Sequence, residues 1–138
     1  MGKTGETKEM RAFLNALQSF GYFRNITDQF QVGIPDIIGS YKGAFIGIEF
    51  KSVDELSGTI PPKGSHPFTS KQVRELGSIE KSEGVGVGVI RCGKKFVLVL
   101  PLFIKDGRVD FNSIPKEYIF DTTTEGVRKF LEAITSTV

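Results

Sequence analysis

The chain has 138 residues, of which 39% are hydrophobic and 25% charged, and its formal net charge is +2. This composition is typical of one globular domain, which we expect to span residues 1–138. The single cysteine, Cys92, excludes an intramolecular disulfide and a cysteine-rich zinc site. No apolar run approaches the roughly 18 residues of a membrane span, and no apolar signal core begins the chain, so we expect a cytoplasmic protein. The mildly basic charge permits a nucleic-acid partner without requiring one.

The first third of the chain predicts a helix followed by strands. Apolar residues at helical spacing predict an amphipathic helix over about residues 7–20, and Gly21 is placed to end it. Aromatic and β-branched residues predict a strand over 22–26. Two apolar runs, 37–38 and 44–48, flank a glycine-containing turn, so we expect a β-hairpin.

The remainder begins with a stretch that has no periodicity. Residues 52–68 contain three prolines and predict a long, mobile loop of the kind that often serves a function. Further elements are predicted in this order: a helix over about 69–83, strands over 85–91 and 95–100, a small hairpin over 103–111, and a helix over 124–134. The order α-β-β-β-α-β-β-α predicts an α/β sandwich around one central sheet.

The second run of the hairpin places acidic and basic residues at its end. On strand periodicity one face is fully apolar: Ala44, Ile46, Ile48 and Phe50. Glu49 and Lys51 share the other face, and a carboxylate in so apolar a strand is costly unless it is paired or bound to a metal. Pairing of the hairpin would bring Asp36 beside Glu49. Gly47, on the same face, is expected to leave room for a metal and a phosphate.

Each of these residues also has a simpler explanation. Asp36 follows Pro35 and could be a turn acid bonded to its own backbone. Glu49 and Lys51 could form an exposed ion pair of little energetic value. Together, however, they suit phosphodiester hydrolysis, in which Mg²⁺ held by one or two carboxylates neutralises the phosphate and activates water. A neighbouring lysine can orient that water and stabilise the developing charge.

The stretch GIPDIIGSYKGAFIGIEFK carries the pattern Pro35-Asp36 and Glu49-Phe50-Lys51, which resembles the signature of PD-(D/E)xK, restriction-endonuclease-like nucleases. It is particularly similar to small phage-type VRR-NUC nucleases and to RecU-type Holliday junction resolvases. The similarity covers about residues 6–100, a nuclease core that leaves 101–138 as an extension. It implies an α/β fold with a central mixed β-sheet flanked by helices. It also implies a protein of the cytoplasm of a bacterial or phage-infected cell. The short connection 27–33 has no room for a RecU-type stalk and favours the compact VRR-NUC form.

The resemblance also implies roles for individual residues. Asp36 and Glu49 would bind the metal, with help from the Phe50 carbonyl, and Lys51 would position the attacking water. The implied cofactor is Mg²⁺, for which Mn²⁺ is expected to substitute.

Two further residues are implied on helices. The family often adds a carboxylate on the first helix, for which Glu9 is our choice and Glu6 the rival, although both are equally well explained as solvated charges. Gln72 matches a family glutamine. It also completes a capping box with Thr69, and the two roles are compatible.

Other polar signals are weaker. The run Gly84-Val85-Gly86-Val87-Gly88 lies within a strand, where glycine allows close backbone approach, and is not expected to bind phosphate. His66 in the long loop could meet a phosphate or simply be solvated. Four cations expected near the acids are candidates for contacts with DNA phosphates, although each could be only a surface charge: Lys42, Lys63, Lys71 and Arg74.

The function implied is a metal-dependent endodeoxyribonuclease that acts on branched DNA, including four-way junctions, as a homodimer. The run 97–100 or the last helix could form the dimer interface, but burial within one subunit explains both equally well. Two alternatives remain open: a nuclease of the same superfamily that is not specific for four-way junctions, and a non-catalytic DNA-binding module.

Overall fold

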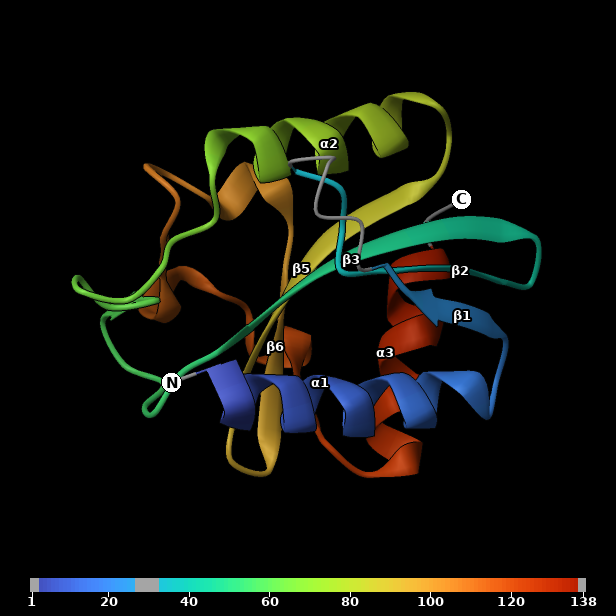
Figure 1. The fold of residues 1–138 in the computed structure, drawn as a ribbon, viewed down its shortest axis with the longest axis horizontal. Coiled ribbons are helices and arrows are strands. Elements are labelled where there is room, and N and C mark those ends of the chain that lie inside the picture. The colour runs from blue at the N-terminus through green and yellow to red at the C-terminus, as the bar shows by residue number, and fades with distance from the viewer. Residues whose placement is uncertain (1–2, 27–32, 137–138) are drawn as a thin grey trace.

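The computed structural model describes residues 3–26 and 33–136, with side chains from Lys8 onward. A mixed sheet forms the middle layer, as Figure 1 shows. Helix α2 (Ser70–Lys81) covers one face, and helices α1 (Lys3–Gln18) and α3 (Thr124–Thr135) cover the other. Within the described ranges, no helix is long and apolar enough to cross a membrane.

Six strands form this sheet, and their bounds follow in spatial order: β1 (Tyr22–Asn25), β2 (Ile37–Tyr41), β3 (Ala44–Ser52), β5 (Val85–Cys92), β6 (Lys95–Val99) and β8 (Ile119–Asp121). The β3–β5 pair is parallel, with α2 in the connection between its strands, and the other neighbours are antiparallel. The predicted α/β class, with a central mixed sheet flanked by helices, is confirmed.

The face predicted to be apolar packs into the larger of two hydrophobic clusters. Ile46, Ile48 and Phe50 are buried there against Phe13 of α1 and Phe130 of α3. The opposite face of β3, which carries Glu49, therefore turns toward α2, as the strand periodicity predicts.

Glycines let α2 lie unusually close to that opposite face. A Cβ atom on Gly86 would lie 2.2 Å from the carbonyl oxygen of Leu76, and one on Gly47 would lie 2.5 Å from Cδ1 of Ile79. The interpretation of the glycine run as a site of close backbone approach is therefore supported. The expectation that Gly47 leaves room for a metal is wrong, because α2 fills that space.

The segment 52–68, predicted to be one long loop, contains some regular structure. It contains strand β4 (Thr59–Ile60), which pairs with β7 (Val109–Asp110) in a second, two-stranded sheet. The predicted small hairpin is reduced to a tight turn with one bridge between Lys105 and Arg108. Strands of two or three residues, including β8, are too short for an alternating pattern to reveal them.

The apolar segments considered for a dimer interface are occupied within the subunit. Val97, Leu98 and Val99 are buried in β6, which lies between β5 and β8. On α3, Phe130 and Leu131 are also buried in the core. Burial within one subunit therefore accounts for both apolar patterns.

Candidate active site

Asp36 and Glu49 meet at the open end of the β2–β3 hairpin, just before β2 begins and near the end of β3. The strand register pairs Ile37 with Ile48, so the preceding and following residues, Asp36 and Glu49, lie next to each other. The backbone N–H of Phe50 donates a hydrogen bond to Oδ2 of Asp36 at 2.8 Å. This bond orients Asp36 toward the end of β3, so the predicted hairpin places the two acids together.

Glu49 is buried with only 3% of its surface exposed. Its Oε2 accepts a hydrogen bond of 2.8 Å from Nε2 of Gln72, whereas its buried Oε1 has no donor among the residues that the structure describes. A buried carboxylate with an unsatisfied oxygen is costly, because it has lost its hydration shell without full replacement.

The electrostatic environment of Glu49 favours its neutral form. Burial, followed by the charge of the neighbouring Asp36, raises the pKa of Glu49 to about 9. The charge of Lys51 lowers this pKa, but by less. The two acids therefore cannot both be ionised at neutral pH without a compensating cation.

Gln72 connects this pair of acids to helix α2. Its Oε1 accepts a hydrogen bond of 2.8 Å from the backbone N–H of Thr69, and its backbone N–H donates to Oγ1 of Thr69 at 3.1 Å. Its Nε2 is thereby left to donate to Glu49. The capping box expected of Gln72 is present, and the other end of the same amide holds Glu49, while a catalytic role for Gln72 stays a prediction.

A cavity of about 600 Å³ opens in front of the acids. Asp36, Glu49 and Lys51 line one side, and loop residues including Ser65 and His66 line the other. Gly88 of β5 pairs with Glu49 of β3, and the ring of Phe68 lies close to this glycine. The centroid of the same ring is 5.5 Å from Nζ of Lys51. Two acids and a lysine therefore share one cavity, as the strand pattern predicts.

Sequence patterns did not identify every lining residue. Ser52 and Ser65 also face the cavity. They lie at a strand end and in a proline-rich loop, where hydroxyl residues are common and carry no periodic signal.

The two carboxyl groups suit a hard divalent cation. Such a cation would neutralise the repulsion between them and give the unsatisfied Oε1 of Glu49 a partner. Within 3–26 and 33–136, no cluster of three or more acidic, histidine or cysteine residues is suited to a metal. Two carboxylates are nonetheless sufficient for Mg²⁺, which keeps several of its water ligands.

Glu9 does not join the two acids. It lies on α1, and its Oε1 accepts a hydrogen bond from the hydroxyl of Ser52, while its Oε2 lies 3.9 Å from the guanidinium of Arg91. No metal-suited cluster among the described residues includes Glu9, but its partner Ser52 lines the cavity, so a catalytic role for Glu9 stays a prediction. The side chain of Glu6 is outside the described residues.

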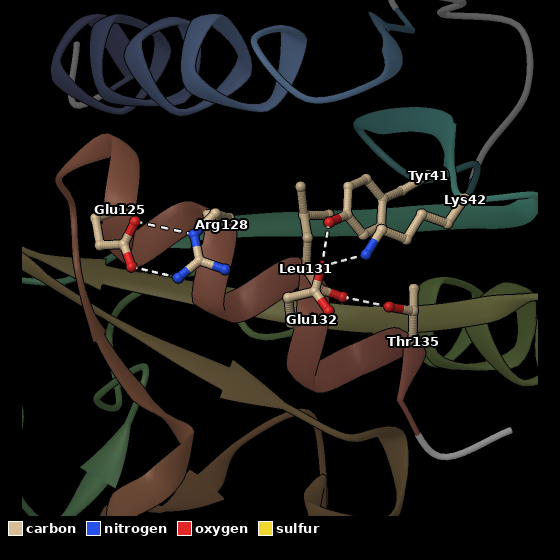
Figure 2. A network of polar contacts seen from close by, with 7 residues as sticks. All are labelled: Tyr41, Lys42, Glu125, Arg128, Leu131, Glu132 and Thr135. Carbon is tan, nitrogen blue, oxygen red and sulfur yellow. Dashed lines mark hydrogen bonds and ion pairs between the residues drawn. The ribbon is translucent and has the colours of Figure 1, made fainter.

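Lys42 was expected near the acids, and that placement is wrong. It lies in the β2–β3 turn, at the far end of β3 and roughly 20 Å from Glu49 at strand spacing. Its Nζ contacts Oε2 of Glu132 on α3 at 2.9 Å, and the hydroxyl of Tyr41 donates to the same oxygen, as Figure 2 shows. These hydrogen bonds, from Tyr41 and then Lys42, lower the pKa of Glu132. The network joins the hairpin to α3 and serves no part of the cavity.

The other three candidate cations lie closer to the cavity. Lys63 is exposed in the loop that forms the cavity wall, and Lys71 and Arg74 are exposed on the first turns of α2. These positions are compatible with contacts to a polyanion, and their DNA-binding role stays a prediction.

Comparisons with known proteins identify the fold. No protein-family model matches the sequence, and no curated protein matches it. Among solved structures, the chain is similar to the 1.6 Å resolution structure of Archaeoglobus fulgidus Hjc, a Holliday junction resolvase from an archaeal hyperthermophile. The TM-score is 0.56 at 12% sequence identity, covering 75% of this chain and 85% of that chain. The two proteins therefore share a fold.

Proposed function

We propose that this protein is a metal-dependent DNA endonuclease that hydrolyses phosphodiester bonds in the cavity formed by β3, the 61–67 loop and α2. The observation that carries the proposal is the position of Glu49, which is buried beside Asp36 with one oxygen lacking a donor among the described residues. Burying Glu49 beside a second, half-buried acid is unfavourable for a structural role alone, whereas it is useful where a cation has to be bound.

Five of the residues that line the cavity have a role in this proposal. Asp36 and Glu49 would hold Mg²⁺, or Mn²⁺ in its place, with the Phe50 carbonyl as a further ligand. The bound ion would supply Lewis-acid stabilisation of the charge that develops on the phosphate. Lys51 would orient the attacking water and stabilise the same charge, while Gln72 fixes the orientation of Glu49.

The substrate we propose is branched DNA, including four-way junctions. Two observations support this: the cavity chemistry, and the fold shared with a protein described as a Holliday junction resolvase. Symmetric cleavage of a junction needs two active sites, which a twofold dimer supplies. Within the superfamily, the short β1–β2 connection favours the compact VRR-NUC form over the stalked RecU form.

The test is cleavage of end-labelled DNA by the wild type and Glu49→Gln, in Mg²⁺ and in EDTA. We expect wild-type cleavage that requires Mg²⁺ and a loss of about 100-fold or more in Glu49→Gln, because a neutral amide is a poor ligand for a hard cation. Glu117→Gln, which neutralises an exposed acid outside the cavity, is the control and should retain wild-type rates. Equal rates in wild type and Glu49→Gln would refute the proposal.

A less specific nuclease is a second candidate. It is favoured by the burial of the apolar residues first considered for a dimer interface, since a monomer could still cut duplex or flapped DNA. Comparing four-way junctions with matched linear duplex separates the two. A non-catalytic DNA-binding module would show no cleavage of either, and its DNA affinity would not change in Asp36→Ala or Lys51→Ala.

A further inference from the structure

The wall of the cavity opposite the acids is made by residues 61–67. This segment lies beside residues 105–111 of the C-terminal extension at one end of the molecule, as Figure 1 shows. Both of its ends are fixed by backbone contacts with that extension. Ile60 pairs with Val109 at one end, and the N–H of Phe68 donates to the carbonyl of Gly107 at 2.9 Å at the other.

Between these two ends the wall forms few hydrogen bonds of its own. Pro61 and Pro62 have no N–H groups, so this part cannot extend the β4–β7 ladder by donating hydrogen bonds. The carbonyl of Pro61, a buried residue, needs a donor, because buried carbonyls are rarely left unpaired, whereas Pro62 and Ser65 are exposed. One internal turn, from the N–H of Ser65 to the carbonyl of Pro62 at 3.0 Å, supplies a single bond.

Arg108 supplies the missing donors. Its Nη1 donates to the carbonyls of Pro61 at 2.7 Å and Pro62 at 2.8 Å, and its Nη2 donates to the carbonyl of Ser65 at 3.2 Å. Among the described residues, it is the side chain that hydrogen-bonds to carbonyls in the middle of the wall. A planar guanidinium can reach three carbonyls in a fixed arrangement, which a lysine ammonium on a flexible chain cannot reproduce.

We propose that Arg108 is a positioning residue for the reaction: its guanidinium fixes the 61–67 wall at the distance from Asp36 and Glu49 that a bound DNA strand requires. The effect of Arg108 on catalysis rests on the proposed function, whereas its anchoring of the wall is independent of that function. It assigns a role to the C-terminal extension, which holds the wall through the 105–111 turn and strand β7.

The decisive variants are Arg108→Lys and Arg108→Ala, with Lys105→Ala as the matched control. Arg108→Lys keeps the positive charge and loses the fixed fork, so its effect cannot be attributed to weaker attraction of DNA. Lys105→Ala removes a cation from the same turn, and the side chain of Lys105 makes no hydrogen bond or ion pair among the described residues.

Anchoring is measured first, without DNA or metal. Trypsin can cut after Lys63, inside the wall, and we expect this cut to be about tenfold faster in Arg108→Ala and intermediate in Arg108→Lys, since local opening governs cleavage. Lys105→Ala should match the wild type in the release of the 1–63 fragment. An unchanged cutting rate at Lys63 in both Arg108 variants, with cooperative unfolding retained, would overturn the inference.

Catalysis is measured second. We expect kcat to fall roughly 10- to 100-fold in Arg108→Lys while the Kd for DNA in Ca²⁺ changes by less than about threefold, because misplacement of the wall affects geometry more than charge. A loosened wall with an unchanged kcat would refute the positioning role. If the wild type cuts no DNA, the proposed function fails, and the trypsin result still decides whether Arg108 anchors the wall.

Discussion

At the residue scale, Glu49 is where burial and charge conflict most strongly. Its carboxyl group is almost fully buried, lies against a second acid and receives one hydrogen bond from Gln72. The pKa of about 9 means that the folded, metal-free protein keeps a proton on this side chain at neutral pH. An unfolded chain would release that proton near the ordinary value of 4.5.

A pH dependence of stability follows from this difference. Between the two pKa values the folded state binds more protons than the unfolded state, so stability is highest at low pH in this window and falls as pH rises. The maximum slope is about 1.4 kcal/mol per pH unit for one proton. We expect the metal-free wild type to lose on the order of 2 kcal/mol between about pH 6 and pH 8, and Glu49→Gln to lose much less.

Urea unfolding in EDTA at these two pH values measures the effect. The control, Glu117→Gln, changes an exposed acid and should keep the wild-type slope. A slope that is the same in Glu49→Gln and the wild type would show that another group is responsible.

Gln72 gives a prediction that separates its two contacts. Gln72→Glu keeps the capping box, in which glutamate is a normal partner, but replaces the donor to Glu49 with a third carboxylate. We expect a loss of cleavage of about 10- to 100-fold, the usual cost of removing a group that orients a ligand. Full activity in Gln72→Glu, with helicity unchanged by circular dichroism, would assign Gln72 to the cap alone.

At the element scale, the site depends on the close approach of α2 to the sheet. Gly86→Ala would place a methyl group 2.2 Å from the Leu76 carbonyl, so the helix must move. We expect it to cost about 1–3 kcal/mol of unfolding free energy, as overpacking does. Gly77→Ala, where a Cβ atom meets nothing within 4 Å, should instead stabilise α2 by roughly 0.5–1 kcal/mol.

Thermal and urea unfolding of the two variants test this pair. Equal stability in Gly86→Ala and the wild type would contradict the close packing of α2 on β5.

Strand periodicity predicted that Asp36, Glu49 and Lys51 lie together. Alternate residues of a strand share one face, which places Lys51 beside Glu49, and the pairing of the hairpin places Asp36 next to Glu49. Periodicity did not place Lys42, because residues at a hairpin turn lie a full strand length from the far end. Nor could it place Glu9, since the sequence does not say which face of the sheet α1 covers. The contact between Arg108 and the wall joins segments more than 40 residues apart, and no local pattern signals it.

At the scale of the whole molecule, the oligomeric state remains a prediction. The apolar residues of β6 and α3 are buried within the subunit, whereas Tyr22, Phe45 and Leu102 are large hydrophobic residues that remain exposed. We expect sedimentation equilibrium to show two chains per four-way junction, because paired nicks need paired sites. One chain per junction would contradict paired cleavage and leave hydrolysis itself intact.

The most direct test of the central claim is the initial rate of Mg²⁺-dependent cleavage of a labelled four-way junction, measured for the wild type beside Glu49→Gln and repeated on linear duplex of the same sequence. We predict metal-dependent cleavage by the wild type that is faster on the junction and about 100-fold or more weaker in Glu49→Gln. Wild-type cleavage of neither substrate above the Glu49→Gln background would contradict the assignment of this cavity as a nuclease active site.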